Sequence, residues 1–415
     1  MIECMHFCKK VLLFTVLSGW WIQTELQAQE SSQGKPKSEA EHLVGAVGKR
    51  FVPDHRVGVY EISAAPGKDG RVILRGKTSV PGAKNALLQE CRAKKISVDD
   101  SIKVLPDESL GKVCYALVRN SVANLRTQPG HASEMATQAL LGMPLNVLEK
   151  RGEWYRVQTP DDYVSWVDEG GISMVDAAGM NQWLRERKII YTDPFGFSYS
   201  RPDLQVQTVS DLVAGDVLRC EGKEEDFYSV VYPDGRKAFV SISSARDYDE
   251  WLTNADPRPE NLVKTAKILL GFPYLWGGTS MKGVDCSGFM KTVFFLNGVI
   301  IQRDASQQAN YGTLLNTEKG YVAFQPGDLL FFGSKAKDNM PERVTHVGMY
   351  IGHSRVIHSS GQVHINSLDS KESDYNGALV SFLVRGRRYV GNIGQKGIIR
   401  VKDNPFYQPR NAVNH

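Results

Sequence analysis

A segment of the chain occurs twice at a distance of 73 residues, and this duplication constrains the fold more than any other sequence feature. The repeated positions carry glycine, aromatic, valine, proline and aspartate side chains. Gly142, Trp154-Tyr155, Val157, Pro160-Asp161 and Trp166 correspond to Gly215, Phe227-Tyr228, Val230, Pro233-Asp234 and Phe239. A constant offset across all these sites indicates two copies of one structural unit.

Each copy consists of short runs in which apolar and polar residues alternate, as in 145–148, separated by glycine, proline and aspartate turns. This pattern is typical of a small all-β barrel. The unit resembles a bacterial SH3-like domain, and we expect two such barrels, at 113–187 and 188–255, each followed by a short helix. Cys220 aligns with Val147 in this register, so we expect it to be a small buried hydrophobic residue.

The composition is that of a folded protein with several domains. The chain has 415 residues, of which 42% are hydrophobic and 23% charged, and this length corresponds to roughly two to four domains. Fifty basic residues nearly balance 46 acidic ones. Such a balance gives no reason to expect a nucleic-acid partner.

The N-terminus has the pattern of a secretory signal peptide. Lys9 and Lys10 precede an apolar run over 11–21, and a polar stretch ending at Ala28 follows. We expect residues 1–28 to be removed and the mature protein to be periplasmic or secreted, without a membrane partner. An uncleaved anchor is the alternative, but the apolar run is shorter than the roughly 20 residues that span a bilayer.

A polar linker is expected over 29–48 and a small α/β module over 49–112. The module's pattern predicts strands at 57–62, 71–75 and 102–105 and a helix at 83–95. We assign no chemistry to it and expect a packing or docking role. In an oxidising compartment, a disulfide between Cys91 and Cys114 is possible.

Cys286 is the candidate nucleophile. A helix is expected over 260–270, and a second helical pattern begins at Cys286, directly after a glycine-rich stretch. A thiol in the first turn of a helix is exposed to the positive end of the helix dipole and to unpaired N–H groups, which favour the thiolate. This position suits a cysteine that attacks a peptide bond.

Two histidines provide a candidate base and its orienting partner. His346 lies in an alternating strand, 345–351, and His358 lies in the next strand, 355–359. Each is six residues from Gly352, so a hairpin centred on that glycine would place them directly opposite each other. We expect His346 to accept the thiol proton and His358 to orient it. Solvated or packed roles are expected for His353 and His364.

Two other interpretations of these residues remain open. Cys286 by itself would fit a buried structural cysteine. Cys286, His346 and His358 together would also fit a zinc site, since thiolate and neutral imidazole both bind zinc. We favour the set of nucleophile, base and orienting residue, and expect no metal and no cofactor.

At these residues the chain resembles the NlpC-type cell-wall cysteine peptidases, which have a papain-like fold. The resemblance is carried by 273–278, 283–289, 303–308, 326–332 and the two histidine strands. It implies a multidomain α+β chain with a papain-like catalytic domain at 256–391 and a C-terminal tail at 392–415. Two preceding SH3-like domains are similar to those of the γ-D-glutamyl-L-diamino-acid endopeptidases.

The resemblance implies hydrolysis of the γ-D-Glu to diamino-acid bond in peptidoglycan stem peptides with a free N-terminal L-Ala. By motif match, Cys286 is the nucleophile, His346 the base and His358 the orienting residue. The resemblance also implies that Tyr274 joins the cysteine N–H in stabilising the oxyanion. Further matched residues border the substrate: Asp285, Ser287 and Ser306 line the groove, and Trp276 forms its wall.

Selectivity for a free amine requires acceptors for an ammonium group. In relatives a Glu and a Tyr of the first SH3-like domain supply part of this clamp, and Glu134 and Tyr163 are the candidates here. Exposed structural roles for both stay open, and Ser165 stands where relatives have a glycine before the tryptophan.

Peptidoglycan-derived peptides are the expected partners, and we expect a monomer. Two alternatives to the proposed activity remain: a noncatalytic peptidoglycan-binding protein, and a hydrolase of intact cross-linked wall.

Overall fold

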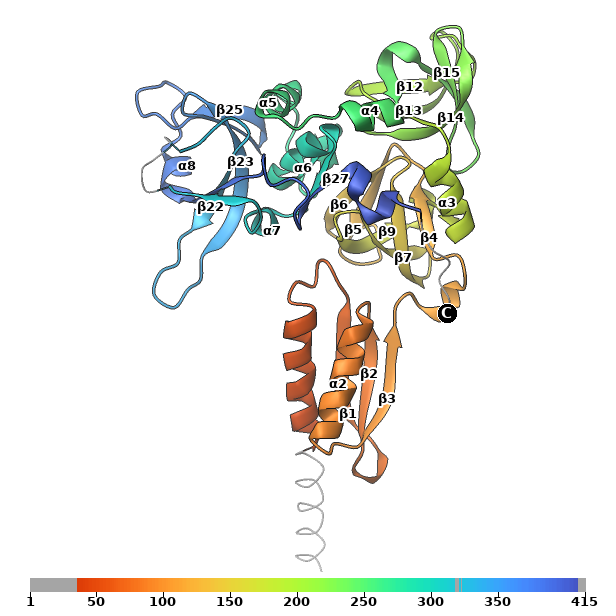
Figure 1. Ribbon diagram of the computed structural model, residues 1–415, viewed down its shortest axis with the longest axis vertical. Coiled ribbons are helices and arrows are strands. Elements are labelled where there is room, and N and C mark those ends of the chain that lie inside the picture. The colour runs from red at the N-terminus through yellow and green to blue at the C-terminus, as the bar shows by residue number, and fades with distance from the viewer. Residues whose placement is uncertain (1–35, 318–320, 322, 410–415) are drawn as a thin grey trace, which may run out of the picture. The chain divides into compact units, whose positions relative to one another are not determined.

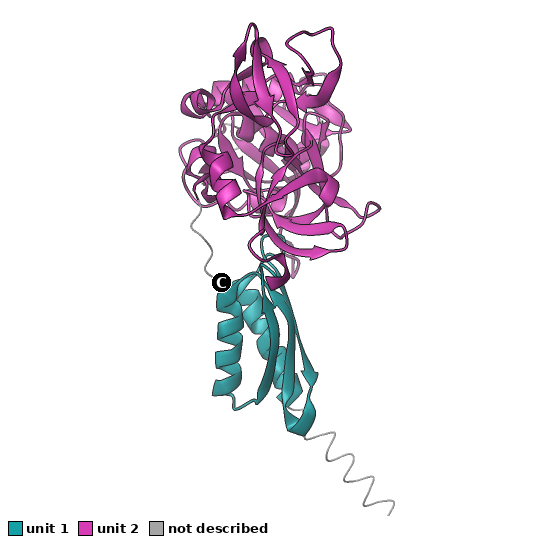
Figure 2. Cartoon of the chain, turned by 90° about the vertical axis from the view of Figure 1, so that its right-hand side faces the viewer, with its two compact units in different colours: residues 1–107 teal, residues 108–415 magenta. Residues whose placement is uncertain are grey.

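The computed structural model describes residues 36–409 except 318–320 and 322 (Figure 1). The predicted signal peptide, 1–28, lies outside these residues. Within the described part of the chain, no helix is both long and apolar enough to cross a membrane. The chain divides into two compact units, Met1–Asp107 and Glu108–His415 (Figure 2).

The first unit is a three-stranded sheet with helices. Its elements are β1 (Tyr60–Pro66), η1 (Lys68–Gly70), β2 (Val72–Thr78), α2 (Pro81–Ala93) and β3 (Val98–Val104). The strands lie in the order β1-β2-β3; β1 pairs antiparallel with β2, and β2 pairs parallel with β3. The predicted order of strand, strand, helix, strand is confirmed, and α2 is the crossover that a parallel pair requires.

The predicted linker is wrong over much of its length, because residues 36–51 are helical. Ala40 and Val47 are fully buried in the core of the first unit, and Leu43 and Val44 pack against that core. Their spacing of three, four and seven residues is that of an amphipathic helix, concealed in the sequence by many polar neighbours. Cys91 is a free, buried cysteine in the same core, and the possible disulfide with Cys114 stays a prediction.

The duplication appears in the second unit as two seven-stranded sheets with the same order. The first sheet runs β10-β4-β7-β8-β9-β5-β6, and the second, read from its other end, runs β17-β11-β14-β15-β16-β12-β13. Each strand of the second sheet begins 73 residues after its counterpart in the first. The strands of the first sheet are β4 (Tyr115–Val118), β5 (Val122–Arg126), β6 (Met135–Leu140), β7 (Pro144–Arg151), β8 (Trp154–Gln158), β9 (Val164–Asp168) and β10 (Ile172–Val175). Those of the second are β11 (Lys188–Tyr191), β12 (Phe195–Tyr199), β13 (Thr208–Val213), β14 (Val217–Glu224), β15 (Phe227–Val231), β16 (Lys237–Ser241) and β17 (Ala245–Asp247).

The two copies also agree in their details. Short 3-10 turns precede the last strands, and helices follow them: η3 (Glu169–Gly171) and α3 (Ala177–Arg185), then η4 (Ile242–Ser244) and α4 (Tyr248–Asn254). Val147 pairs with Val157 as Cys220 pairs with Val230, and Cys220 is buried as expected. Gly142 has φ +77°, and a Cβ there would lie 2.3 Å from the Val217 carbonyl oxygen, so this position requires glycine.

The C-terminal part of the second unit, which the sequence predicts to be catalytic and which we call the catalytic part, is built on a six-stranded antiparallel sheet, in the order β21-β26-β22-β23-β24-β25. Its strands are β21 (Thr313–Leu315), β22 (Leu329–Ser334), β23 (Arg343–Gly352), β24 (Arg355–Ser360), β25 (Gln362–Ser367) and β26 (Leu383–Arg388). The helices are α5 (Pro259–Ile268), α6 (Cys286–Leu296), α7 (Ala305–Gln308) and α8 (Gly377–Phe382), and two short strands, β18 (Thr279–Ser280) and β19 (Gly283–Val284), precede α6. Helix α6 is buried over most of its surface, as the central helix of a core is.

The predicted C-terminal tail is wrong for residues 398–407, which are part of the fold. β27 (Ile398–Arg400) pairs with β20 (Val299–Ile301), and η5 (Val401–Asp403) and η6 (Pro405–Tyr407) follow. Phe406 is buried, and the Asn404 side chain donates a hydrogen bond to the Pro160 carbonyl at 2.8 Å. This segment therefore joins the catalytic part to the first repeated sheet.

Candidate active site

Cys286 is the first residue of α6, as predicted. Asp285 caps the helix by accepting a hydrogen bond from the Gly288 N–H at 2.7 Å. Burial, and after it the charge of Asp285, raises the pKa of the Cys286 thiol to about 11, although the N–H groups of Val347 and Ser287 lower it. The backbone N–H at the helix start therefore favours the thiolate, as expected, but burial outweighs it, so a base is needed to remove the thiol proton.

The two histidines lie on one face of the β23–β24 hairpin and contact each other. Nε2 of His346 and Nδ1 of His358 are 2.9 Å apart. The predicted direct opposition is wrong, because His358 pairs with Gly348. The turn lies at His353-Ser354, where both residues have positive φ, and not at Gly352. This register differs from the predicted one by two residues, which preserves the face on which each side chain lies.

Both rings are neutral at pH 7. Burial, and after it the proximity of His358 and His364, lowers the pKa of His346 to about 3. Burial also lowers the pKa of His358 to about 4. A neutral imidazole has one nitrogen with a lone pair, so His346 can accept a proton.

Asn366 in β25 is a site residue that the sequence did not reveal. Its Oδ1 lies 2.9 Å from Nε2 of His358 and 3.0 Å from Nε2 of His364. His364 pairs directly with His358 across the strands, and the two ring centroids are 4.4 Å apart. A solvated or packed role was expected for His364, and the sequence did not predict that it lies beside His346 and His358. The sequence signal that could have revealed this is the spacing of His364 and Asn366, which are two residues apart in one strand and so lie on the same face.

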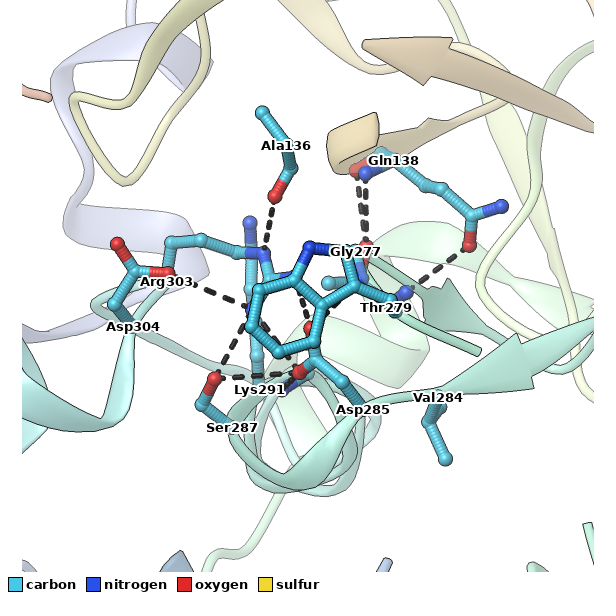
Figure 3. A network of polar contacts seen from close by, with 12 residues as sticks. Ala136, Gln138, Gly277, Thr279, Val284, Asp285, Ser287, Lys291, Arg303 and Asp304 are labelled. Atoms are coloured by element: carbon cyan, nitrogen blue, oxygen red, sulfur yellow. Dashed lines mark hydrogen bonds and ion pairs between the residues drawn. The ribbon is translucent and has the colours of Figure 1, made fainter. Parts of the chain in front are cut away.

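Asp285 and Ser287 belong to a buried network around Arg303 (Figure 3). The guanidinium binds Asp285 at 2.5 and 3.1 Å and Ser287 Oγ at 3.0 Å. It also donates to the Ala136 carbonyl of β6 at 3.1 Å. Arg303 is 2% exposed, and a bidentate pair of this kind holds both partners in one geometry. The network thus joins the start of α6 to the first repeated sheet.

Tyr274 and Trp276 lie in the segment before α6. Tyr274 is partly buried; this burial, with the nearby Cys286 and Asp285, raises the pKa of its hydroxyl to about 12, so the hydroxyl remains a donor. Trp276 is 62% exposed, and its Nε1 donates a hydrogen bond to Glu134 Oε1 at 2.6 Å. The predicted wall residue and the predicted clamp residue are therefore in contact.

Tyr163 also reaches the catalytic part. Its hydroxyl donates a hydrogen bond to Asp304 Oδ2 at 3.4 Å. Ser306 lies two residues further along, in the first turn of α7, and is partly exposed. Asp304 is a carboxylate that the sequence prediction did not single out. Within the described residues, no group of three or more His, Cys, Asp and Glu side chains is arranged to hold a metal ion.

Comparison with known proteins agrees with this architecture. The NlpC/P60 family model matches residues 271–381, and the bacterial dipeptidyl-peptidase Sh3 domain model matches 125–172. The gamma-D-glutamyl-L-lysine dipeptidyl-peptidase of Bacillus cereus is 31% identical over 241 residues, covering 55% of this chain and 68% of the relative. Dipeptidyl-peptidase 6 of Lysinibacillus sphaericus is 28% identical over 272 residues, covering 63% of this chain and 94% of the relative.

A crystal structure of an NlpC/P60 family protein from Bacillus cereus is similar with a TM-score of 0.57 and 25% identity, covering 66% of this chain and 99% of that one. The fold and site are those of a cysteine peptidase with a mixed α/β, multidomain architecture. The chain belongs to the NlpC/P60 family.

Proposed function

We propose that this enzyme hydrolyses the γ-D-Glu to diamino-acid bond of peptidoglycan stem peptides that carry a free N-terminal L-Ala. One observation carries the proposal: Glu134 and Tyr163 of the first SH3-like domain contact Trp276 and Asp304 of the catalytic domain. This contact adds a carboxylate-bearing wall to a cysteine peptidase site. The names of the similar dipeptidyl-peptidases agree with the specificity.

Cys286, His346 and His358 carry the chemistry in this proposal. His346 shares its Nε2 with His358, so its Nδ1 is the nitrogen available to the thiol. His346 takes the thiol proton, and the sulfur attacks the carbonyl carbon of the γ-linked amide. The same proton then goes to the leaving amine, and water, deprotonated by His346, hydrolyses the thioester to release the acid.

Tyr274 is the proposed side-chain donor to the oxyanion, together with the N–H of Cys286. The raised pKa of its hydroxyl supports this role, because the donor must keep its proton while negative charge develops on the substrate oxygen. Asp285, Ser287 and Ser306 are the proposed groove residues. Trp276, which is largely exposed, is the proposed wall.

The free amine is proposed to bind among Glu134, Tyr163 and Asp304. Carboxylates near an ammonium group favour it over a neutral acetamide, which lacks the charge and has a larger volume. Asp304 extends the predicted clamp, because the Tyr163 hydroxyl links it to the SH3-like domain.

The proposed organisation places this enzyme outside the cytoplasm. The proposed substrate belongs to the cell wall, and the N-terminal pattern supports a signal peptide at 1–28. We propose two SH3-like barrels at 113–187 and 188–255, supported by the matching strand order of the two sheets. The first module is proposed to dock a partner or pack.

A defined panel of L-Ala-γ-D-Glu-diamino-acid peptides tests the activity, with products identified by mass spectrometry. We expect the parent enzyme to release the L-Ala-γ-D-Glu dipeptide and the Cys286→Ala variant to release none. Turnover by Cys286→Ala would remove Cys286 as nucleophile. Binding of wall fragments without turnover by the parent enzyme would support the noncatalytic alternative instead.

A further inference from the structure

Three hydrogen-bonding groups converge on one oxygen next to the histidine pair. Asn366 Oδ1 lies 2.9 Å from Nε2 of His358 and 3.0 Å from Nε2 of His364, and it accepts a hydrogen bond from Asn376 Nδ2 at 3.2 Å. An amide oxygen can only accept. If this oxygen faces His358, the His358 Nε2 must carry a hydrogen.

The orientation of both amides follows from backbone groups, whose polarity is fixed. Asn376 is the N-cap of α8, and its Oδ1 accepts the Leu379 N–H at 3.2 Å. Its Nδ2 therefore faces Asn366. On the other side, Asn366 Nδ2 faces the Asp374 carbonyl oxygen at 3.4 Å. Rotating either amide by 180° would place donor against donor or acceptor against acceptor, so the observed orientation is favoured.

These orientations determine the tautomer of each catalytic ring in turn. The buried His358 is neutral, and with a hydrogen on Nε2 it has its lone pair on Nδ1. That lone pair faces Nε2 of His346 at 2.9 Å, so His346 carries its hydrogen there. The lone pair of His346 is then on Nδ1, the nitrogen that the proposed mechanism assigns to the proton of Cys286.

We propose that Asn366, oriented by Asn376, is a positioning residue that fixes the tautomers of His358 and His346. Its assignment to catalysis rests on the proposed function, in which His346 is the base. The role differs from that of His358, which contacts the base directly. Asn366 acts on the base through His358. Asn376, the N-cap of α8, holds Asn366 in its orientation and is itself held by a backbone N–H.

Kinetics of three variants test the positioning role. Asn366→Leu has a similar volume and no acceptor, and we expect kcat to fall about 10- to 100-fold with KM changed by less than about twofold. Asn366→Asp keeps the acceptor and should retain more activity. Its charge should also move the acidic limb of the kcat profile to higher pH.

Asn376→Asp is the sharper variant, because aspartate is as good an N-cap as asparagine but has no hydrogen for Asn366. If Asn376 only capped α8, this substitution would leave kcat unchanged. We expect kcat to fall while thermal stability stays close to that of the parent. Asn392→Asp is the matched control: Asn392 is also a side-chain amide donor of the catalytic part, to Thr313 and the Arg388 carbonyl, and we expect full activity.

Nitrogen NMR of 15N-histidine-labelled Cys286→Ala protein reports the tautomers without turnover. We expect His346 and His358 both to carry hydrogen on Nε2, and mixed tautomers in the Asn366→Leu background. A hydrogen on Nδ1 of His358 in the parent background, or unchanged tautomers and kcat in Asn366→Leu, would overturn the proposal. Because the spectra need no substrate, they test the effect of Asn366 on the tautomers even if the parent enzyme cleaves none of the peptides and the proposed function fails.

Discussion

Cys286 and the two neighbouring histidines are all uncharged in the resting protein. The thiol is protonated because it is buried beside Asp285, and the imidazoles are neutral because they are buried beside each other. A neutral thiol and a neutral imidazole require no buried charge in the resting enzyme, which avoids the desolvation cost of an ion pair. In the proposed mechanism, negative charge develops on the substrate oxygen only when the carbonyl is attacked. Hydrogen-bond donors to that oxygen then have the largest effect on the rate.

Tyr274 provides the test of such a donor. Burial raises the pKa of its hydroxyl to about 12, so the hydroxyl keeps its proton at neutral pH, and Tyr274→Phe should remove one proposed oxyanion hydrogen bond and little else. We expect kcat to fall about 100- to 1000-fold with KM nearly unchanged. Steady-state kinetics on L-Ala-γ-D-Glu-diamino-acid peptides measure this. Tyr375→Phe, at an exposed position of the same domain, is the control, and equal rates for the two variants would exclude the role.

At the scale of elements, the β23–β24 hairpin carries both histidines on one face, and its stability depends on pH. In the unfolded chain each imidazole binds a proton near pH 6.5, whereas in the folded protein the pKa is about 3 for His346 and about 4 for His358. Between these values the unfolded chain binds more protons than the folded one. Acid therefore destabilises the hairpin as the pH falls below 6.5.

We expect the opening free energy of β23 and β24 to be lower at pH 5 than at pH 7.5 by about 2 kcal/mol for each of the two imidazoles. Hydrogen exchange of the strand amides, corrected for the intrinsic rate, measures this difference. His358→Gln should remove about half of it. His353→Asn, at the exposed turn of the same hairpin, should leave it intact. A pH dependence unchanged in His358→Gln would contradict the assignment.

At the scale of the whole molecule, a buried ion pair joins α6 to the first SH3-like domain. Lys291 lies in α6 five residues after Cys286, and its Nζ is 2.7 Å from Asp161 Oδ2. The two side chains are 11% and 1% exposed. Asp161 is also bonded to Thr159 at 2.6 Å and belongs to the loop that ends at Tyr163. The position of the proposed clamp therefore depends on the helix that begins at Cys286.

Lys291→Met should loosen this loop by leaving Asp161 buried and unpaired, at a cost of about 3–5 kcal/mol in stability. We expect KM for free-amine peptides to rise and the preference over N-acetylated peptides to fall, while the alkylation rate of Cys286 stays unchanged. The ratio of kcat/KM for the two peptides is the measurement.

The matched control for Lys291→Met is Arg156→Met, which breaks another buried pair, with Glu149, inside the same SH3-like domain. It should lower stability without changing the preference for a free amine. Loss of the preference in both variants would show that general destabilisation, and not the clamp loop, is responsible. The double variant Lys291→Met/Asp161→Asn, which removes both charges, should recover stability.

Local sequence patterns predicted much of this protein. The 73-residue offset predicted two units with one strand order, the glycine-rich segment predicted a helix that begins at Cys286, and the alternating strands placed His346 and His358 on one face. Periodicity and turn chemistry act over a few residues, so they can be recognised without knowing what lies nearby in space. The helix over 36–51 was missed because polar residues surround its four apolar positions.

Only the tertiary structure decided which distant residues complete the site. Asn366 beside His358, Arg303 between Asp285 and Ala136, and Asp304 beside Tyr163 are contacts between segments that are far apart or carry no distinctive pattern. The hairpin register and the packing of residues 398–407 were decided in the same way. Such contacts depend on how the sheets and helices pack together, because burial and hydrogen-bond satisfaction are properties of the whole fold. The sequence by itself identified the candidate reacting residues, and packing determined which residues surround them.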